Sequence, residues 1–403
     1  MLLESTTTAV LLTIGGFLIL GLVANYLSPK LHIPRVTLLI LCGVALGPSG
    51  FDLLPEGHER WYTLFSNIAL LMIGFILGCK LSLSALKKFG KQVFWISIFE
   101  VLGVALLVFT GLVLLGVQME IALILAGIGP ASAPAAVTNV IEGLKAKGRY
   151  TDTLLGIVAV DDAWGLIVFS ILLAAANALS RHTGYMEALY SGGWEFGGAI
   201  LIGVALGLPA AWLTDHIRGG EPMQAEALGF MLICGGIAHL LNASFILAAM
   251  VMGVVVANTA QHTERAFKTL REFEWPIMIL FFVLAGSSLH VEKLPQIGLA
   301  GAAYIVLRVI GLVAGAYLGG TISKASGMIR KYIGLAITPQ AGVALGMALV
   351  AGNHFPELKD TFIPLIIGTT VFFELTGPVF TRLTVMKVGE AGQAEDEKTE
   401  EAV

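Results

Sequence analysis

Two adjacent aspartates, Asp161 and Asp162, stand in the middle of the apolar segment GIVAVDDAWGLIVF. A charge in the centre of a membrane segment is costly and usually marks a functional site. Neighbouring residues of a helix point about 100° apart, so we expect one carboxylate to face a cavity and the other to face a packed partner. Such a pair could bind and release protons near neutral pH, with a titration that belongs to the pair.

A deprotonated carboxylate is also a hard oxygen ligand, which suits a small alkali cation. Proton and cation would compete for one site at Asp161 and Asp162, and this competition would itself couple their movements. The alternative is a structural pair held by an ion bridge.

Three other ionisable residues, Glu100, Arg308 and Glu374, are predicted to lie inside apolar segments. Arginine keeps its charge, so Arg308 is expected to have an acidic partner, which could be Asp161, Glu100 or Glu374. We expect Arg308 to fix the core and to adjust the proton affinity of a neighbouring carboxylate. Whether Glu374 binds ions or only forms an ion pair stays open at this point.

Two apolar segments carry the sequences GPASAP (residues 129–134) and TPQAG (residues 338–342). Proline lacks the backbone N–H and interrupts a helix, so Pro130, Pro134 and Pro339 predict two broken helices. Corresponding breaks in two halves of a chain are typical of transport sites. The polar residues that could supply neutral oxygens or cap the broken ends are Ser132, Thr338 and Gln340.

The composition of the chain indicates that membrane-spanning segments must position these residues. The chain has 403 residues, of which 56% are hydrophobic and 13% charged, whereas soluble domains carry about 25% charged residues. A membrane span needs about 20 apolar residues, and the sequence predicts thirteen spans. They cover residues 8–27, 34–53, 63–79, 92–116, 119–141, 152–178, 195–213, 224–240, 244–260, 273–290, 296–321, 330–352 and 361–386.

The distribution of basic residues predicts the orientation. Alternating the loops between two sides places 19 Lys and Arg residues on one side and 4 on the other, with Arg308 inside a span. Basic loops stay cytoplasmic, so the N-terminus is predicted outside and the acidic, solvated tail in the cytoplasm. We expect a multi-pass protein of the bacterial inner membrane. No nucleotide-binding or HExxH motif is found, so we expect no enzyme, cofactor or nucleic-acid partner.

An internal repeat relates the third and tenth spans. They are an odd number of spans apart, so they cross the membrane in opposite directions. The sequence therefore predicts an all-α integral membrane fold of two inverted six-helix repeats, joined by one linker helix. The matching residues are Gly78, Leu81, Leu86 and Gly90 in the first copy and Gly286, Leu289, Leu294 and Gly298 in the second.

Taken together, the aspartate pair after a broken helix, the basic Arg308 and the stretch PIMILFFVLAGSSL (Pro276–Leu289) resemble the bacterial sodium/proton antiporters of the cation:proton antiporter superfamily. The resemblance implies their NhaA-like fold with crossed broken helices, a homodimer, and a core that moves against a panel. The implied panel comprises residues 1–79 and 224–290, the core residues 92–178 and 296–386, the linker residues 195–213, and the tail residues 387–403.

The same resemblance implies roles for individual residues. Asp162 would be the principal ligand of Na+ and H+, and Asp161 would pair with the basic residue. An arginine at Arg308 together with Glu100 looks most like the NHA branch of the superfamily, in which a Glu–Arg bridge is expected. We therefore expect exchange of Na+, and of Li+, for H+. The alternatives are K+/H+ exchange, a carrier of an organic anion with a related fold, and a membrane sensor that transports nothing.

Overall fold

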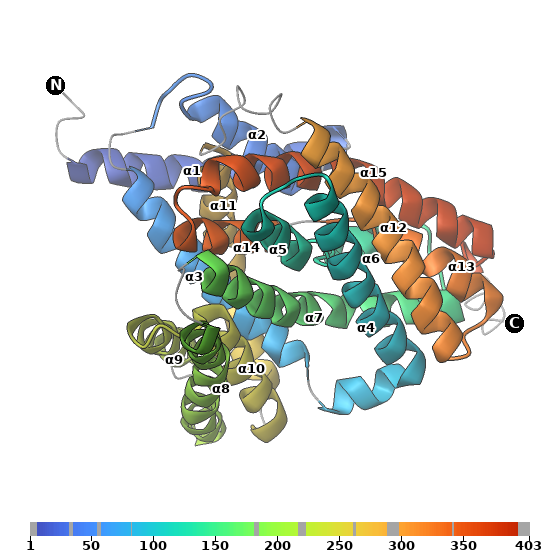
Figure 1. Cartoon of the computed structure of the whole chain (residues 1–403). Helices are drawn as coiled ribbons and strands as arrows, with labels where there is room; N and C mark the ends of the chain where they lie inside the picture. The colour runs from blue at the N-terminus through green and yellow to red at the C-terminus, as the bar shows by residue number, and fades with distance from the viewer. Residues whose placement is uncertain are drawn as a thin grey trace, which may run out of the picture.

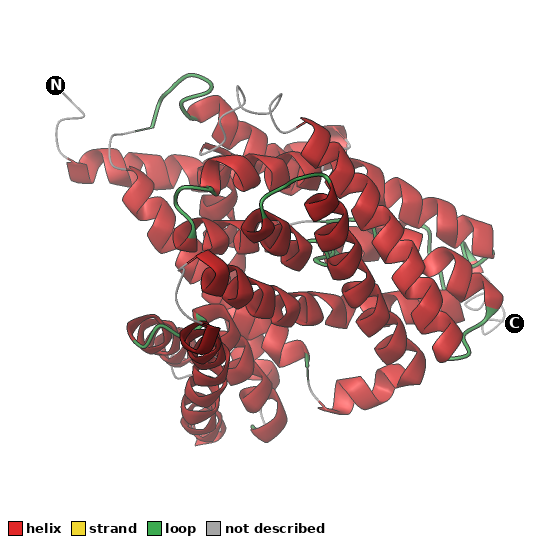
Figure 2. Ribbon diagram, in the orientation of Figure 1, coloured by secondary structure: helices red, strands yellow, loops and turns green. Residues whose placement is uncertain are grey.

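The computed structural model describes residues 6–31, 35–54, 58–81, 83–180, 185–216, 223–260, 263–287, 298–340 and 342–393. Within these ranges every regular element is an α-helix (Figure 2). A helix satisfies each backbone polar group within its own segment, which suits a chain surrounded by lipid. The helices labelled in Figure 1 are α1 (Thr6–Leu31), α2 (Arg35–Leu46), α3 (His58–Lys80), α4 (Leu83–Leu114), α5 (Met119–Ile128), α6 (Pro134–Gly143), α7 (Arg149–Ser180), α8 (Tyr185–His216), α9 (Met223–Leu240), α10 (Phe245–Thr259), α11 (Thr263–Ser287), α12 (Gly298–Ile322), α13 (Gly327–Ala336), α14 (Gly342–His354) and α15 (Lys359–Val388).

The predicted spans correspond to these helices in chain order. Among the described residues, six helices are long and apolar enough to cross a membrane by length and composition, and shorter apolar helices of 10–17 residues occupy the remaining predicted spans. Two predicted spans each contain two helices, α5 with α6 and α13 with α14. The all-helical membrane fold is therefore confirmed.

The second predicted span, residues 34–53, is shorter in the structure than expected. α2 ends at Leu46, and the chain then turns, with the Gly50 N–H donating to the Gly47 carbonyl at 3.0 Å. Pro48 disfavours helical geometry in the residue before it, which explains why the apolar run does not continue as a helix.

The helices form two groups. The core group comprises α4–α7 and α12–α15, with α4 against α12, α5 against α7, and α13 and α14 against α15. The panel group comprises α1–α3 and α8–α11, with α3 and α8 against α10, and α11 against α2. In Figure 1 the core group occupies the centre and right, α8–α10 the lower left, and α1, α2 and α11 the upper left. The two groups meet along a seam where α7 contacts α3, α8 and α10, and α14 contacts α3.

Close helix contacts inside the panel group reflect the internal repeat. A Cβ atom at Gly78 of α3 would lie 1.9 Å from the Met250 carbonyl oxygen of α10, and one at Gly286 of α11 would lie 2.1 Å from the Ile40 carbonyl oxygen of α2. The third helix of each half thus meets the second helix of the other half at a glycine, which is what an inverted repeat produces. Leu289 and Leu294 of the repeated motif lie outside the described residues.

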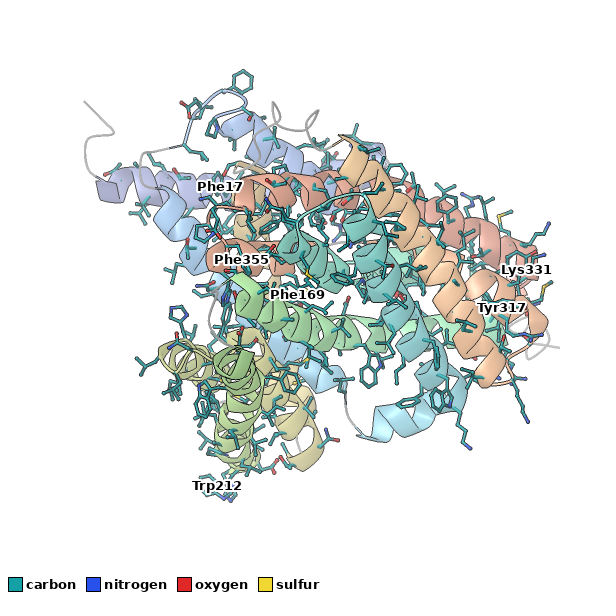
Figure 3. The ribbon with its side chains drawn as sticks, in the orientation of Figure 1. Phe17, Phe169, Trp212, Tyr317, Lys331 and Phe355 are labelled. Atoms are coloured by element: carbon teal, nitrogen blue, oxygen red, sulfur yellow. The ribbon has the colours of Figure 1, made fainter. Side chains whose placement is uncertain are left out.

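The outward-facing side chains are apolar, as a lipid-facing surface requires. Trp212 and Tyr317 are 63% and 50% exposed, whereas Phe169 and Phe355 are buried inside the bundle (Figure 3). Tryptophan and tyrosine are enriched where membrane meets water. The exposed aromatic side chains are therefore positioned to contact lipid.

The contact between α4 and α12 gives a first testable expectation. A Cβ atom at Gly315 would lie 2.3 Å from the Phe99 carbonyl oxygen and 2.7 Å from Glu100 Cα. Gly315→Ala is therefore expected to destabilise the protein by about 1–3 kcal/mol, as overpacking of a tight interface does. Gly301→Ala is the control on the same helix, because nothing lies within 4 Å of the added atom. Thermal unfolding in detergent would measure both variants, and equal melting temperatures would contradict the expectation.

The prediction that the tail from residue 387 onward is solvated is wrong for one residue, Glu390. Glu390 accepts hydrogen bonds from Tyr150 N at 2.9 Å, Thr151 N at 2.8 Å and Thr151 Oγ1 at 2.7 Å. The first N–H groups of a helix have no helical partner and lie at its positive end, so a carboxylate placed there is stabilised. Glu390 therefore caps α7, the helix that carries the aspartate pair. Residues 394–403 lie outside the described part of the chain.

Candidate functional site

Both expected helix breaks are present, at the same place in each half. α5 ends at Ile128, residues 129–133 are not helical, and α6 begins at Pro134. α13 ends at Ala336, and α14 begins at Gly342. Proline suits the first position of α6 because its missing N–H would have no helical partner there. Each break leaves carbonyl groups of one half-helix without their usual donors.

Arg308 of α12 lies between the two breaks and binds both of them. Its Nε donates to the Gly129 carbonyl at 2.7 Å, Nη2 to the Ala131 carbonyl at 2.9 Å, and Nη1 to the Thr338 carbonyl at 2.7 Å. The guanidinium is fully buried, with its carbon 4.3 Å from the centre of the Phe373 ring. Its positive charge lies at the C-terminal ends of α5 and α13, where the helix dipole is negative.

These contacts revise the expectation that an acidic side chain would bind Arg308 directly. The three hydrogen bonds above go to main-chain carbonyls, while Glu100 and Asp161 act on the guanidinium through their charge. The physical reason is the pair of breaks: they present unpaired carbonyl oxygens, which a planar group with five donors binds well.

Gln340, in the second break, reaches the first one. Its Nε2 donates to the Ile128 carbonyl at 3.4 Å and to the Tyr304 hydroxyl at 3.2 Å. The Thr338 hydroxyl instead donates to the Leu335 carbonyl at 2.9 Å and caps its own half-helix. The two breaks therefore cross at a point held by one guanidinium and one amide.

The acidic side chains lie beside this crossing. Asp161 of α7 and Glu100 of α4 are fully buried, and Asp162 is 3% exposed. The groups that act on the Asp161 carboxylate are Glu100, Ser132 in the first break, and Arg308. No described residue donates a hydrogen bond of ordinary geometry to the oxygens of Asp161 or Glu100. Asp161 is thus the aspartate that faces Glu100 and the basic group.

The charges of the site leave it suited to a cation or a proton. Asp161, Asp162 and Glu100 are three carboxyl groups, whereas Arg308 is the basic side chain, among the residues that the structure describes, whose charge acts on Asp161 and Glu100. Within the described part of the chain, no three His, Cys, Asp or Glu side chains converge on a possible metal ion. A cation bound here would therefore need hydroxyl or main-chain oxygens as well, and the Ser132 hydroxyl on the first break is a candidate because it acts on Asp161.

Glu374 is turned towards the other group of helices. It accepts a hydrogen bond from the Thr37 hydroxyl, which joins α15 of the core group to the start of α2 in the panel group. Sequence reasoning missed Thr37, and also missed Thr381, whose Oγ1 donates to the Ala336 carbonyl at 2.8 Å and caps α13. Neither threonine stands in a pattern that distinguishes it from others in apolar helices.

Sequence comparison finds relatives over most of the chain. A family profile described as the transmembrane part of sodium/hydrogen exchangers matches residues 16–387. The ammonium/H+ antiporter subunit AmhT of Alkalihalophilus pseudofirmus is 24% identical over 370 residues, which cover 90% of this chain and 92% of that protein.

Two solved structures of the sodium proton antiporter MjNhaP1 from Methanocaldococcus jannaschii have the same fold. One, at pH 8, superposes with a TM-score of 0.75 at 20% identity and covers 95% of this chain and 99% of that chain. The other, from electron microscopy, gives a TM-score of 0.66 at 20% identity, covering 95% and 96%. Since the family profile spans nearly the whole chain and the fold agrees, this protein belongs to the sodium/hydrogen exchanger family of membrane cation/proton antiporters.

Proposed function

We propose that the chain exchanges Na+, and also Li+, for H+ at the Asp161–Asp162 pair. The observation that carries the proposal is the buried group of carboxylates beside the crossed breaks, with Arg308 as its basic neighbour. Burying so much negative charge is unfavourable unless a cation or proton neutralises it. An exchanger needs a site that is always occupied by one of the two.

In this proposal Asp162 is the exchanging ligand. Its carboxylate holds either a proton or a cation, because a protonated carboxyl group loses most of its affinity for a cation. Binding a cation therefore releases a proton into the same water-accessible space. Asp161 and Glu100 stay with Arg308, whose guanidinium keeps its proton and preserves the crossing of the two breaks. Ser132 and Thr338 supply neutral oxygens at the breaks.

Movement between the two faces of the membrane is proposed to involve the two groups of helices. The core group carries every acidic and basic side chain of the site, whereas the panel group carries none of them. Sliding of the core group along the seam would carry the bound ion across. The panel helices would form a homodimer, with the N-terminus outside and the C-terminus in the cytoplasm of a bacterial cell.

The identity of the cation is the finer part of the proposal. One relative is named an ammonium/H+ antiporter subunit, so NH4+ and K+ are the cations that compete with the Na+ assignment. A carrier of an organic anion is disfavoured, because the carboxylates beside the breaks would repel it.

A transport measurement tests the proposal directly. Purified protein would be placed in liposomes that contain a pH-sensitive dye and carry an imposed pH gradient. Addition of Na+ or Li+ is expected to dissipate the gradient, with a smaller response to K+. Ammonium would be compared with protein-free liposomes, because NH3 crosses the bilayer unaided. A response to K+ or NH4+ alone would replace the Na+ assignment, and no response to any of the four would overturn the antiporter proposal.

A further inference from the structure

A polar cavity lies on the seam between the two groups of helices, away from the aspartate pair. Its volume is about 170 Å³. The core group contributes side chains from α7 and α14, and the panel group contributes side chains from α3, α8 and the α9–α10 turn. The polar lining residues are Asn67, Asn177, Glu195, His239, Asn242, Ser244 and His354.

The cavity is distinct from the site described above. Asn177 follows Asp162 on the same helix by about 22 Å, from a rise of about 1.5 Å per residue. In the predicted orientation, this end of α7 faces the outside of the cell.

A hydrogen bond crosses the seam inside the cavity. Asn177 Nδ2 donates to Glu195 Oε2 at 3.4 Å and lies 3.2 Å from His354 Nδ1. One amide therefore connects α8 of the panel group with α14 of the core group. Since α7 carries the aspartates and α14 follows the second break, this wall of the cavity would move with the proposed ion site.

The opposite wall is held firmly by the panel helices. Trp194 Nε1 donates to the Leu241 carbonyl at 2.8 Å, and the Ser244 N–H donates to the Glu195 carbonyl at 3.1 Å. Between them Asn242 adopts a left-handed conformation, with φ 52°, which asparagine tolerates better than most residues. The turn is thus fixed beside Glu195 and brings the Asn242 amide to the cavity.

The charge and size of the cavity favour a partly hydrated monovalent cation. Among the lining residues Glu195 is the one carboxylate and none is lysine or arginine, so the other ionisable side chains are the imidazoles of His239 and His354. The side-chain amides offer neutral oxygens, which bind alkali ions without excluding water. A water molecule takes up about 30 Å³ in the liquid, so the cavity has room for an ion with several of its waters.

We propose that this cavity is an outer cation-binding site, at which Glu195 and the surrounding amides hold a hydrated alkali cation before it enters, or after it leaves, the site at Asp162. The inference rests on the proposed exchange of cations for protons. It adds a second binding position, with its own carboxylate, on one side of the membrane.

The test compares the two sides of the membrane separately. Right-side-out vesicles present the outer face to added Na+, and everted vesicles present the cytoplasmic face. Glu195→Gln keeps the size of the side chain and removes its charge. The Na+ concentration that gives half-maximal exchange is expected to rise about three- to tenfold in right-side-out vesicles, as loss of one screened attraction predicts. It is expected to change less than about twofold in everted vesicles.

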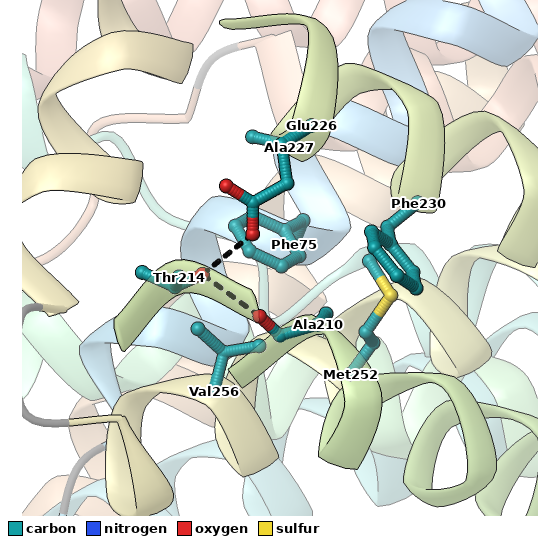
Figure 4. Close-up of a pocket in the computed structure, with 8 residues that line it drawn as sticks. All are labelled: Phe75, Ala210, Thr214, Glu226, Ala227, Phe230, Met252 and Val256. Carbon is teal, nitrogen blue, oxygen red and sulfur yellow. Dashed lines mark hydrogen bonds between the residues drawn. The ribbon is translucent and has the colours of Figure 1, made fainter. Parts of the chain in front are cut away.

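Two further variants make the result interpretable. Asn242→Gly removes the amide but permits the left-handed backbone, so it should also raise the half-maximal Na+ concentration in right-side-out vesicles. Glu226→Gln is the matched control, because Glu226 also belongs to the panel group and accepts a hydrogen bond from Thr214 at 3.0 Å in a separate small pocket (Figure 4). Glu226→Gln should leave the half-maximal Na+ concentration unchanged in both vesicle types.

The possible outcomes distinguish failure of the outer site from failure of the proposed cation/proton exchange. If the unaltered protein exchanges no cation in either vesicle type, the proposed function fails. If it exchanges Na+ but Glu195→Gln leaves the outer half-maximal concentration unchanged, the outer site is wrong. An equal rise in both vesicle types would also overturn it, because a binding site on one face must act from that face.

Discussion

Replacing Asp162 with asparagine is expected to reduce cation-dependent proton release to the level of protein-free liposomes. Asparagine is nearly the same size but cannot bind a proton near neutral pH or neutralise a cation. Asp162 is 3% exposed in the middle of α7, so water cannot take over its role. The measurement is the dye assay in liposomes with Na+ and Li+, together with the melting temperature of the purified variant.

Asp152→Asn is the matched control for this prediction. Asp152 lies on the same helix, in its first turn, and is exposed, so the same chemical change there should leave exchange intact. Asp162→Asn should also melt close to the unaltered protein, because removing a buried charge relieves part of its desolvation penalty. Exchange that persists in Asp162→Asn would show that another carboxylate carries the cation.

Replacing Arg308 with methionine is expected to destabilise the protein more than any other substitution considered for this site. The change removes three hydrogen bonds to carbonyls of both breaks and leaves Glu100 and Asp161 without their basic neighbour. Loss of one partner from a buried charged group costs about 3–5 kcal/mol. Melting temperature and the yield of monodisperse protein in detergent would measure the effect.

Arg308→Lys separates charge from geometry. Lysine keeps a positive charge, but its compact ammonium cannot reach three carbonyl groups in the plane of a guanidinium. Its stability is expected to lie between those of Arg308→Met and the unaltered protein. Arg382→Lys on α15 is the control, since Arg382 is exposed. If Arg308→Met has the same melting temperature as the unaltered protein, the guanidinium does not hold the breaks together.

Two hydrogen bonds between the core group and the panel group bear on the proposed movement. Thr37 donates to Glu374 between α2 and α15, and Asn177 donates to Glu195 between α7 and α8. Each has a carboxylate on one side and a neutral donor on the other. Such contacts are strong enough to favour one position of the core group, yet weaker than an ion pair excluded from water. Sliding of the core group would exchange them for others.

Much of this architecture is readable from the sequence. Hydrophobic runs separated by basic loops predict the spans, because a helix satisfies every backbone polar group of such a run without help from water. Pro130, Pro134 and Pro339 predict the two breaks, because proline removes a backbone donor at a known position. The aspartate pair stands out because buried charge is rare in lipid. These signals are local, so a single chain displays them without its fold.

The partners of the charged groups were decided only by the tertiary structure. Arg308 binds carbonyls from residues up to 179 positions away, and Glu374 meets Thr37 across 337 positions. A carbonyl oxygen is present on every residue, so sequence cannot indicate which ones a break leaves unpaired. The capping of α7 by Glu390 depends in the same way on neighbours brought together by packing. The sequence therefore determined which groups must be neutralised, and the crossing of the two halves determined which groups neutralise them.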